Sequence, residues 1–222
     1  MNVNFFDIAD KFADTLLDIV YPKECIFCHK KINSFGKLAI CQKCADTQIK
    51  IKIVRDDSHV FDEAVGILKY EGNVRKCMID FKFRGIKYYG YTFAYEIYRQ
   101  SCNFGYIKDA IMCCVPISRS RKRAYNQTAV IADELTKMLG QKCCFDLLYK
   151  RADIPQLSKM SLSERRMNIR GAFGVNPKYN IYGKDIVVID DIFTSGSTAD
   201  ECARTLKMYG AANVYVVCAC YD

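Results

Sequence analysis

The sequence lacks several features that would assign it quickly to a class. It contains no apolar run of membrane-spanning length, and its first twenty residues carry aspartates instead of the basic start of a signal peptide. Neither the dinucleotide fingerprint G-x-G-x-x-G nor the phosphate-loop lysine motif of nucleoside triphosphatases is present. Internal repeats and low-complexity segments are also missing. We expect a cytoplasmic protein, and its length of 222 residues suits one medium domain with a small appendage.

Histidine is scarce, whereas cysteine is abundant. Only two histidines are present, and both lie far along the chain from the loops described below, so imidazole catalysis is not expected. The thirteen cysteines are odd in number, and pairs such as Cys113-Cys114 lie within apolar runs. Reduced, buried thiols explain these residues better than a disulfide scaffold does. The formal net charge of +8 favours anionic partners such as phosphates or nucleic acid.

Four cysteines form a separate pattern, C-x2-C-x12-C-x2-C. Cys25 and Cys28 make the first pair, and Cys41 and Cys44 make the second. Two such pairs supply four thiolates, the ligand set of a structural zinc site, while His29 is expected to be an exposed bystander. A redox-active C-x-x-C needs only one pair, in a thioredoxin-like context that is missing here. The sequence predicts structural zinc, and it leaves open whether this module also contacts nucleic acid or protein.

Residues 2–20 precede the cysteines and have apolar residues at helical spacing. This pattern predicts an amphipathic helix that ends near Pro22 and docks on the chain itself. Its polar face is acidic, which weakens a membrane-surface interpretation. The polar stretch 46–58 is interpreted as a link to the main domain.

Residues 186–198 carry the most informative pattern. Four apolar residues at 186–189 predict a buried parallel strand, and Asp190 and Asp191 then fall at the edge where open α/β sheets place ligands. A hydroxyl-rich loop follows and opens into an amphipathic helix over residues 198–209. An acidic strand–turn–helix would explain the two aspartates, but not the whole thirteen-residue pattern. The loop residues are Thr194, Ser195, Gly196, Ser197 and Thr198.

This loop has the chemistry of a sugar-phosphate site. Its small residues allow close approach of the backbone, and N–H groups at a helix N-terminus attract an anion. We expect these groups to bind a phosphate, while Asp190 and Asp191 position ribose hydroxyls or the waters of Mg²⁺. The pattern looks like the 5-phosphoribosyl-1-pyrophosphate (PRPP) signature of type I phosphoribosyltransferases.

A basic segment follows a second predicted core strand, which spans residues 110–116. Four cations occupy five consecutive positions from Arg119 onward. A solvated charge run would account for them, but their place after a core strand favours a pyrophosphate loop that contains Ser118 and Arg119. A helix is expected after this loop, ending near Met138.

The same segment also suits a nucleic-acid interface. A basic groove can follow a single-stranded backbone while an aromatic ring, here Tyr125, stacks on a base. This hypothesis assigns single-stranded DNA to a surface formed by Lys82, Arg84, Arg121, Lys122 and Arg123.

Residues 150–173 form a long, arginine-rich segment with weak periodicity. Such segments in compact domains are often lids, and arginine side chains suit closure over phosphates. We therefore predict a lid that includes Arg165 and Arg166. A short surface helix that starts at Ser161 would be compatible with that role.

In this order and spacing, the motifs resemble the ComF family of phosphoribosyltransferase-like proteins over nearly the whole chain. Ala124 and Tyr125 depart from the family, which usually has Gly and Phe there, and alanine restricts backbone approach to an anion. The matching elements are the four-cysteine motif, Lys82 to Gly85, Val115-Pro116 with Arg119, Arg123 with Asn126-Gln127, Arg151, Gln156, Leu162 to Arg166 with Asn168, Gly171 to Phe173, and the loop from Asp190 to Thr198.

The resemblance implies an α/β fold: a type I phosphoribosyltransferase-like, mostly parallel sheet flanked by helices. It places a helix and zinc-knuckle module in residues 1–50 and the phosphoribosyltransferase-like domain in residues 59–222. It further implies PRPP with Mg²⁺ at Asp190 and Asp191, and a role in DNA uptake during natural transformation beside a helicase partner. Two alternatives stay open: an active phosphoribosyltransferase with an unknown acceptor, in which the two aspartates are the catalytic residues, and a PRPP sensor without turnover.

Overall fold

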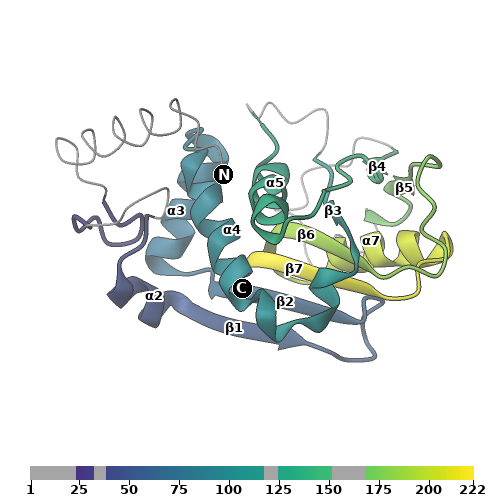
Figure 1. Cartoon of the computed structure of the whole chain (residues 1–222), viewed down its shortest axis with the longest axis horizontal. Coiled ribbons are helices and arrows are strands. Elements are labelled where there is room, and N and C mark those ends of the chain that lie inside the picture. Colours follow the sequence, from purple (N-terminus) through teal and green to yellow (C-terminus); the bar gives the residue numbers. More distant parts are fainter. Residues whose placement is uncertain (1–23, 33–38, 118–124, 152–168) are drawn as a thin grey trace, which may run out of the picture.

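The computed structural model describes residues 24–32, 39–117, 125–151 and 169–222. At its centre lies a five-stranded sheet (Figure 1). Its strands are β1 (Ile49–Val54), β2 (Glu63–Lys69), β3 (Ile111–Cys114), β6 (Ile186–Phe193) and β7 (Val214–Tyr221). They lie in the order β1-β2-β7-β6-β3, and all neighbours are parallel except β1, which is antiparallel to β2 at one edge.

Helices cover both faces of this sheet. The helices are α2 (Gln42–Gln48), α3 (Gly72–Phe83), α4 (Tyr88–Gln100), α5 (Gln127–Leu139) and α7 (Ser197–Met208), with short 3₁₀ turns η1 (Ser101–Asn103) and η2 (Gly105–Lys108). α3, α4 and α5 pack on one face, and α7 packs on the other (Figure 1). This architecture confirms the predicted α/β class with a mostly parallel, helix-flanked sheet.

The central strands are apolar on both sides because both faces are covered. Residues 186–189 of β6 are all fully buried; Val187 and Ile189 belong to the core under α3, α4 and α5, while Ile186 and Val188 face α7. A parallel strand buried on both faces therefore reads as a continuous apolar run, as the sequence predicted.

Two predicted boundaries are wrong. β6 does not end at residue 189 but continues to Phe193, and Asp190 pairs with Cys218 of β7, so the two aspartates lie within the strand. The predicted link over residues 46–58 contains the end of α2 and all of β1. β1 was missed because its Ile-Lys alternation leaves a mostly exposed edge strand that looks polar.

A second, two-stranded antiparallel sheet is formed by β4 (Leu148–Lys150) and β5 (Phe173–Val175). These strands flank the predicted lid segment, most of which lies outside the described residues. All thirteen cysteines are free, in agreement with the reduced-thiol interpretation. Within the described ranges, every helix is too short or too polar to cross a bilayer.

Candidate functional site

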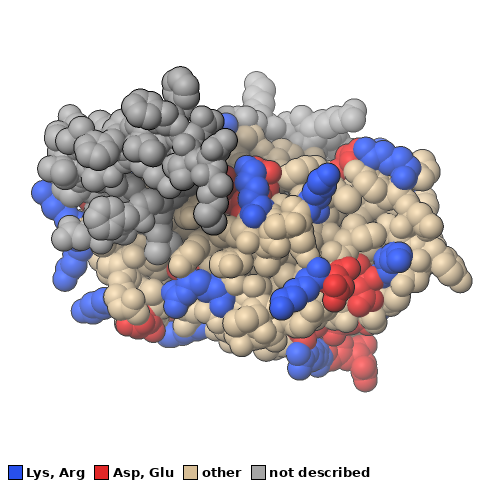
Figure 2. All heavy atoms as spheres, in the orientation of Figure 1, with Lys and Arg blue, Asp and Glu red and all other residues tan. Residues whose placement is uncertain are grey.

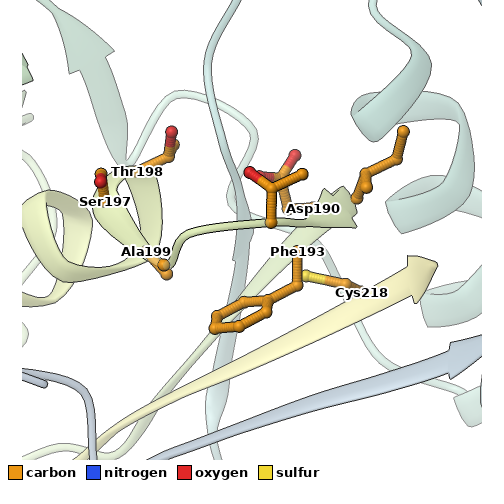
Figure 3. A pocket seen from close by; sticks show the side chains of 9 residues that line it. Asp190, Phe193, Ser197, Thr198, Ala199 and Cys218 are labelled. Atoms are coloured by element: carbon orange, nitrogen blue, oxygen red, sulfur yellow. The ribbon is translucent and has the colours of Figure 1, made fainter. Parts of the chain in front are cut away.

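The candidate site lies where β6 passes into α7. Asp190 side-chain atoms and the turn that follows line a small hollow, together with Phe193 and Cys218 from the strands beneath (Figure 3). The turn residues in this lining are Thr194, Gly196, Ser197 and Thr198. The structure therefore brings the predicted acid pair and the predicted hydroxyl-rich loop to one edge of the sheet.

The turn at Gly196 aims the start of α7 at this hollow. Gly196 has a φ of 74°, the left-handed region that glycine adopts without strain, and α7 begins at the next residue. The hydroxyl oxygens of Ser195 and Ser197 are 3.0 Å apart. The first N–H groups of a helix have no partner within that helix, so this end of α7 can bind an anion.

Asp191 already has a cation beside it. Lys82, near the end of α3, places its Nζ 2.8 Å from Asp191 Oδ1, and both side chains are only 13–14% exposed. Breaking a pair this well shielded leaves one charge without compensation, which is costly. Lys82 is therefore part of the acid-pair site in this structure and not an open surface cation.

The carboxyl group of Asp190 has a higher pKa than that of an ordinary aspartate. Burial, followed by the charge of Asp191, raises the pKa of Asp190 to about 7. The backbone N–H of Asp191, 2.8 Å from Asp190 Oδ1, opposes this rise, as do Lys82 and the hydroxyl of Thr128 at 3.4 Å. The two neighbouring acids thus differ: Asp191 is paired with a cation, and Asp190 titrates near neutral pH.

The N-terminus of α5 and the end of α3 support this arrangement. Asn126 caps α5 by accepting a hydrogen bond from the Ala129 N–H at 3.3 Å. Gln127 Nε2 donates to the Lys82 carbonyl at 3.2 Å, and the Tyr125 hydroxyl donates to the carbonyl of Phe81. These bonds join the end of α3, which carries Lys82, to the start of α5, which carries Thr128.

Tyr125 is half-buried in this support. Its ring centre lies 5.7 Å from that of Phe81, and the Lys87 ammonium lies 5.3 Å from the Tyr125 ring centre. Stacking of Tyr125 on a base stays a prediction. Arg84 is exposed and forms a 3.2 Å ion pair with Asp80.

The other predicted site residues lie outside the described residues. On the face shown in Figure 2, the lysine and arginine side chains of the described residues stand apart from one another, some of them beside acidic ones. The helix predicted over residues 2–20 also lies outside the described ranges. The predicted site residues outside these ranges are Ser118, Arg119, Arg121, Lys122, Arg123, Arg165 and Arg166.

Sequence reasoning missed three contributors to the site. Lys82 was assigned to DNA but pairs with Asp191, and Thr128 was seen only as part of a helix. His59 was set aside as distant, yet its ring lies against Gly196 and its Nδ1 is 2.9 Å from Asp200. Lys82 belongs to a motif element, but no local motif marks the three contacts, since the partners lie 62 to 141 positions apart along the chain.

The four motif cysteines converge in a separate cluster. The sulfur atoms of Cys25, Cys28, Cys41 and Cys44 all lie within 4.8 Å of one another, and those of Cys28 and Cys41 are 3.7 Å apart. Tetrahedral coordination with metal–sulfur bonds of about 2.3 Å separates the sulfurs by about 3.8 Å. The donor set and its spacing therefore fit a metal ion such as zinc.

Backbone N–H groups turn toward this cluster. The N–H of Lys30 lowers the pKa of the Cys28 thiol to about 7, while burial raises the pKa of Cys25 and of Cys44. The cluster is also docked on the main core, because Cys77 of α3 donates to the carbonyl of Ile26 at 2.6 Å. It is thus continuous with the domain that carries the acid pair.

Curated proteins with similar sequences are named for DNA use and competence. The chain is 30% identical over 108 residues to DNA utilization protein YhgH of Escherichia coli O157:H7, covering 48% of this chain and 47% of that protein. It is 33% identical over 105 residues to YhgH of Salmonella typhi, covering 46% and 44%. It is 24% identical over 99 residues to Competence protein F of Haemophilus influenzae, covering 44% and 43%.

These matches confirm the resemblance predicted from the motifs. The aligned part spans just under half the length of these curated relatives. No protein-family model matches the chain.

Solved structures with a similar arrangement include phosphoribosyltransferases. A glutamine PRPP amidotransferase from B. subtilis has a TM-score of 0.39 at 16% identity, covering 58% of this chain and 26% of its own. A hypoxanthine phosphoribosyltransferase from Staphylococcus aureus has a TM-score of 0.38 at 16% identity, covering 60% and 62%.

Proposed function

We propose that this chain binds PRPP with Mg²⁺ at the acid pair and the Gly196 turn, and that it serves DNA uptake. The observation that carries the PRPP proposal is the hollow that Asp190 lines together with the first turn of α7, with Asp191 next to Asp190 at the same end of β6. Helix-terminal N–H groups suit a 5-phosphate, and carboxylates suit ribose hydroxyls. The names of the relatives support the DNA-uptake part.

The acid pair offers oxygen donors that fit a hydrated Mg²⁺. Asp191 is shared with Lys82, so a metal-bound ligand must compete with an ammonium that is already 2.8 Å away. When bound, Mg²⁺ would neutralise part of the negative charge of the pyrophosphate group of PRPP. This chain's own contribution is to hold the ribose through Asp190 and the phosphate through the residues of the turn.

The binding proposal is tested by calorimetry with PRPP and Mg²⁺. The double variant Asp190→Asn with Asp191→Asn should abolish binding, because it removes both carboxylate acceptors while keeping side-chain size. A matched control replaces another adjacent acid pair, Asp133→Asn with Glu134→Gln on α5, which contacts Lys137. Equal PRPP affinity in the first double variant and the wild type would refute the site.

We further propose that single-stranded DNA contacts the basic segment after β3. Affinity should then fall with salt by about 0.7 log units per phosphate contact for each tenfold rise. Replacing Arg121, Lys122 and Arg123 by alanine should flatten this slope. The control removes the same charge from the exposed lysines at 108, 142 and 184. A slope that both variants change equally would assign the effect to net charge alone.

Turnover is a distinct question from binding. A screen of nucleobases and amines for PRPP-dependent pyrophosphate release distinguishes an active phosphoribosyltransferase from a binding protein.

We also propose that zinc is the metal of the cysteine cluster, because four sulfur donors converge there. The helicase partner implied by the resemblance and the cytoplasmic location expected from the sequence stay predictions.

A further inference from the structure

His59 lies directly against the turn at Gly196. The Cε1 atom of His59 is 2.8 Å from the point where a Cβ at position 196 would stand, so the ring fills that space. The ring stacks on Phe61 at 4.5 Å between centres with an 18° interplanar angle, and it meets Phe193 edge-on at 6.5 Å. With a side chain only 13% exposed, His59 forms a fixed support for the turn.

A carboxylate links His59 to the first turn of α7. His59 Nδ1 is 2.9 Å from Asp200 Oδ2, and the N–H of Val60 donates to Asp200 Oδ1 at 2.8 Å. The Asp200 N–H in turn donates to the Gly196 carbonyl at 2.7 Å. Because an ionised carboxylate can only accept hydrogen bonds, Nδ1 carries the proton in this contact.

The contact between His59 and Asp200 also affects the electrostatics of the phosphate-binding turn. Asp200 is the acidic residue in the first turn of α7, the same turn whose residues Ser197 and Thr198 line the hollow. A free carboxylate there would repel an incoming phosphate. Two donors from residues 59 and 60 hold its oxygens, which stabilises the negative charge away from the anion site.

We propose that His59 is a positioning residue for the 5-phosphate of a sugar phosphate. It acts through Asp200, by holding that carboxylate, and through Gly196, by supporting the turn. This inference rests on the proposed function, because it assigns a support to the same phosphate-binding turn. The inference goes beyond the proposed function because it gives a role to His59, which the motif at residues 186–198 does not contain.

The test compares PRPP with pyrophosphate, which lacks the 5-phosphate, by calorimetry on the full chain. His59→Phe keeps an aromatic ring but loses the donor to Asp200, and we expect PRPP affinity to fall about tenfold, the typical value of one hydrogen bond to a charged group. Pyrophosphate affinity should stay unchanged. A fall in both would indicate general damage to the site and would overturn the inference.

A second variant separates positioning from a merely structural role. Adding Asp200→Asn to His59→Phe removes the carboxylate that His59→Phe leaves without its partner, and we expect most of the PRPP affinity to return. If His59 were only a structural prop, the second change would lower affinity further. His59→Asn, which keeps an N–H donor, should bind PRPP better than His59→Phe does, and the reverse order would overturn the proposal.

The outcomes distinguish this inference from the proposed function. Wild-type protein that fails to bind PRPP refutes the proposed function itself. Wild-type binding together with unchanged binding in His59→Phe refutes only the role of His59. If His59→Phe does not fold, Asp200→Asn alone carries the test: PRPP affinity within about threefold of wild type is expected, and a tenfold loss would show that the carboxylate itself is needed.

Discussion

The cysteine cluster and the acid-pair site concentrate negative charge in different ways. The cysteine cluster draws four ligands from residues 25 to 44, and its sulfurs are surrounded by backbone N–H groups and by one another. The acid pair includes its own cation, because Lys82 reaches Asp191 from α3. Burial raises the pKa of Cys25 and Cys44, so an external cation is needed to hold those thiols as thiolates.

The difference teaches what each site requires for its assembly. The cluster is built from the turn at residues 25–28 and the start of α2 and fits a metal ion, whereas the acid pair depends on the packing of α3, α5 and β6. Removing a ligand from the first should release a metal. Changing a residue in the second should alter protein stability and the charge of its neighbours.

Loss of the metal is expected to have the largest effect. Cys28→Ser removes one of four ligands, and structural zinc in small modules contributes on the order of 10 kcal/mol at neutral pH. We expect stoichiometric zinc in the wild type, and metal loss with local unfolding of residues 24–48 in the variant, measured by elemental analysis and hydrogen exchange. Cys102→Ser, at an exposed cysteine on η1, is the control. Wild-type protein without zinc that also resists reconstitution would contradict the site.

Loss of the internal cation is expected to have the next largest effect. Lys82→Met leaves Asp191 mostly buried without its partner and should lower the free energy of unfolding by about 3 kcal/mol. It should also raise the pKa of Asp190 above about 7, because Lys82 lowers it now. Urea unfolding measures the first effect. Lys207→Met, which breaks a 3.0 Å pair with the one-third-exposed Asp62, should cost less than about 1 kcal/mol.

A double variant sharpens this prediction. Adding Asp191→Asn to Lys82→Met removes the stranded charge and should restore much of the lost stability. If the two losses simply add, the pair does not carry the energy that its geometry suggests.

These two regions also differ in how far the sequence predicted them. The spacing of Cys25 to Cys44 predicted their convergence, since all four lie close together in the chain. The pattern from residue 186 to 198 predicted a strand, an acid pair and a turn for the same reason. Local periodicity reports such neighbours directly.

The contacts that complete the acid-pair site could not be predicted from the sequence. Lys82 and Asp191 are 109 positions apart, and His59 and Asp200 are 141 apart. Their meeting depends on the sheet order, which places β2 beside β7 and β7 beside β6. No local pattern encodes that order. β1 was missed for a different reason. Its alternating Ile and Lys residues form a mostly exposed edge strand, and the sequence alone does not show that this strand pairs with β2.

The raised pKa of Asp190 predicts that replacing this residue increases protein stability at high pH while it weakens PRPP binding. A carboxyl whose folded pKa lies above its unfolded value binds more protons when folded, so stability falls as pH rises from about 4 to about 7. Asp190→Asn removes this loss, and its advantage over wild type should grow by about 2 kcal/mol between pH 5 and pH 8. Urea unfolding at both pH values measures it, while PRPP binding should weaken.

The control for this prediction has the opposite shift. The pKa of Asp146 is lowered by Lys178 and Tyr179, so Asp146→Asn should bring no gain in stability at pH 8. A pH-independent difference between wild type and Asp190→Asn would show that Asp190 is an ordinary, ionised aspartate.

The smallest expected effect returns to the cysteine cluster and concerns backbone strain. His29 follows the first cysteine pair with a φ of 58°, a left-handed conformation that costs most residues about 1–2 kcal/mol. Its side chain is more than half exposed, and within the described part of the chain its ring lies 3.9 Å from the Glu24 carboxylate. His29→Gly should therefore stabilise the metal-bound protein by about 1 kcal/mol, measured by thermal unfolding. His29→Ala keeps the strain and should bring no such gain. Loss of metal in the glycine variant would mean instead that the imidazole takes part in coordination, and the four-sulfur site would have to be replaced by one that includes nitrogen.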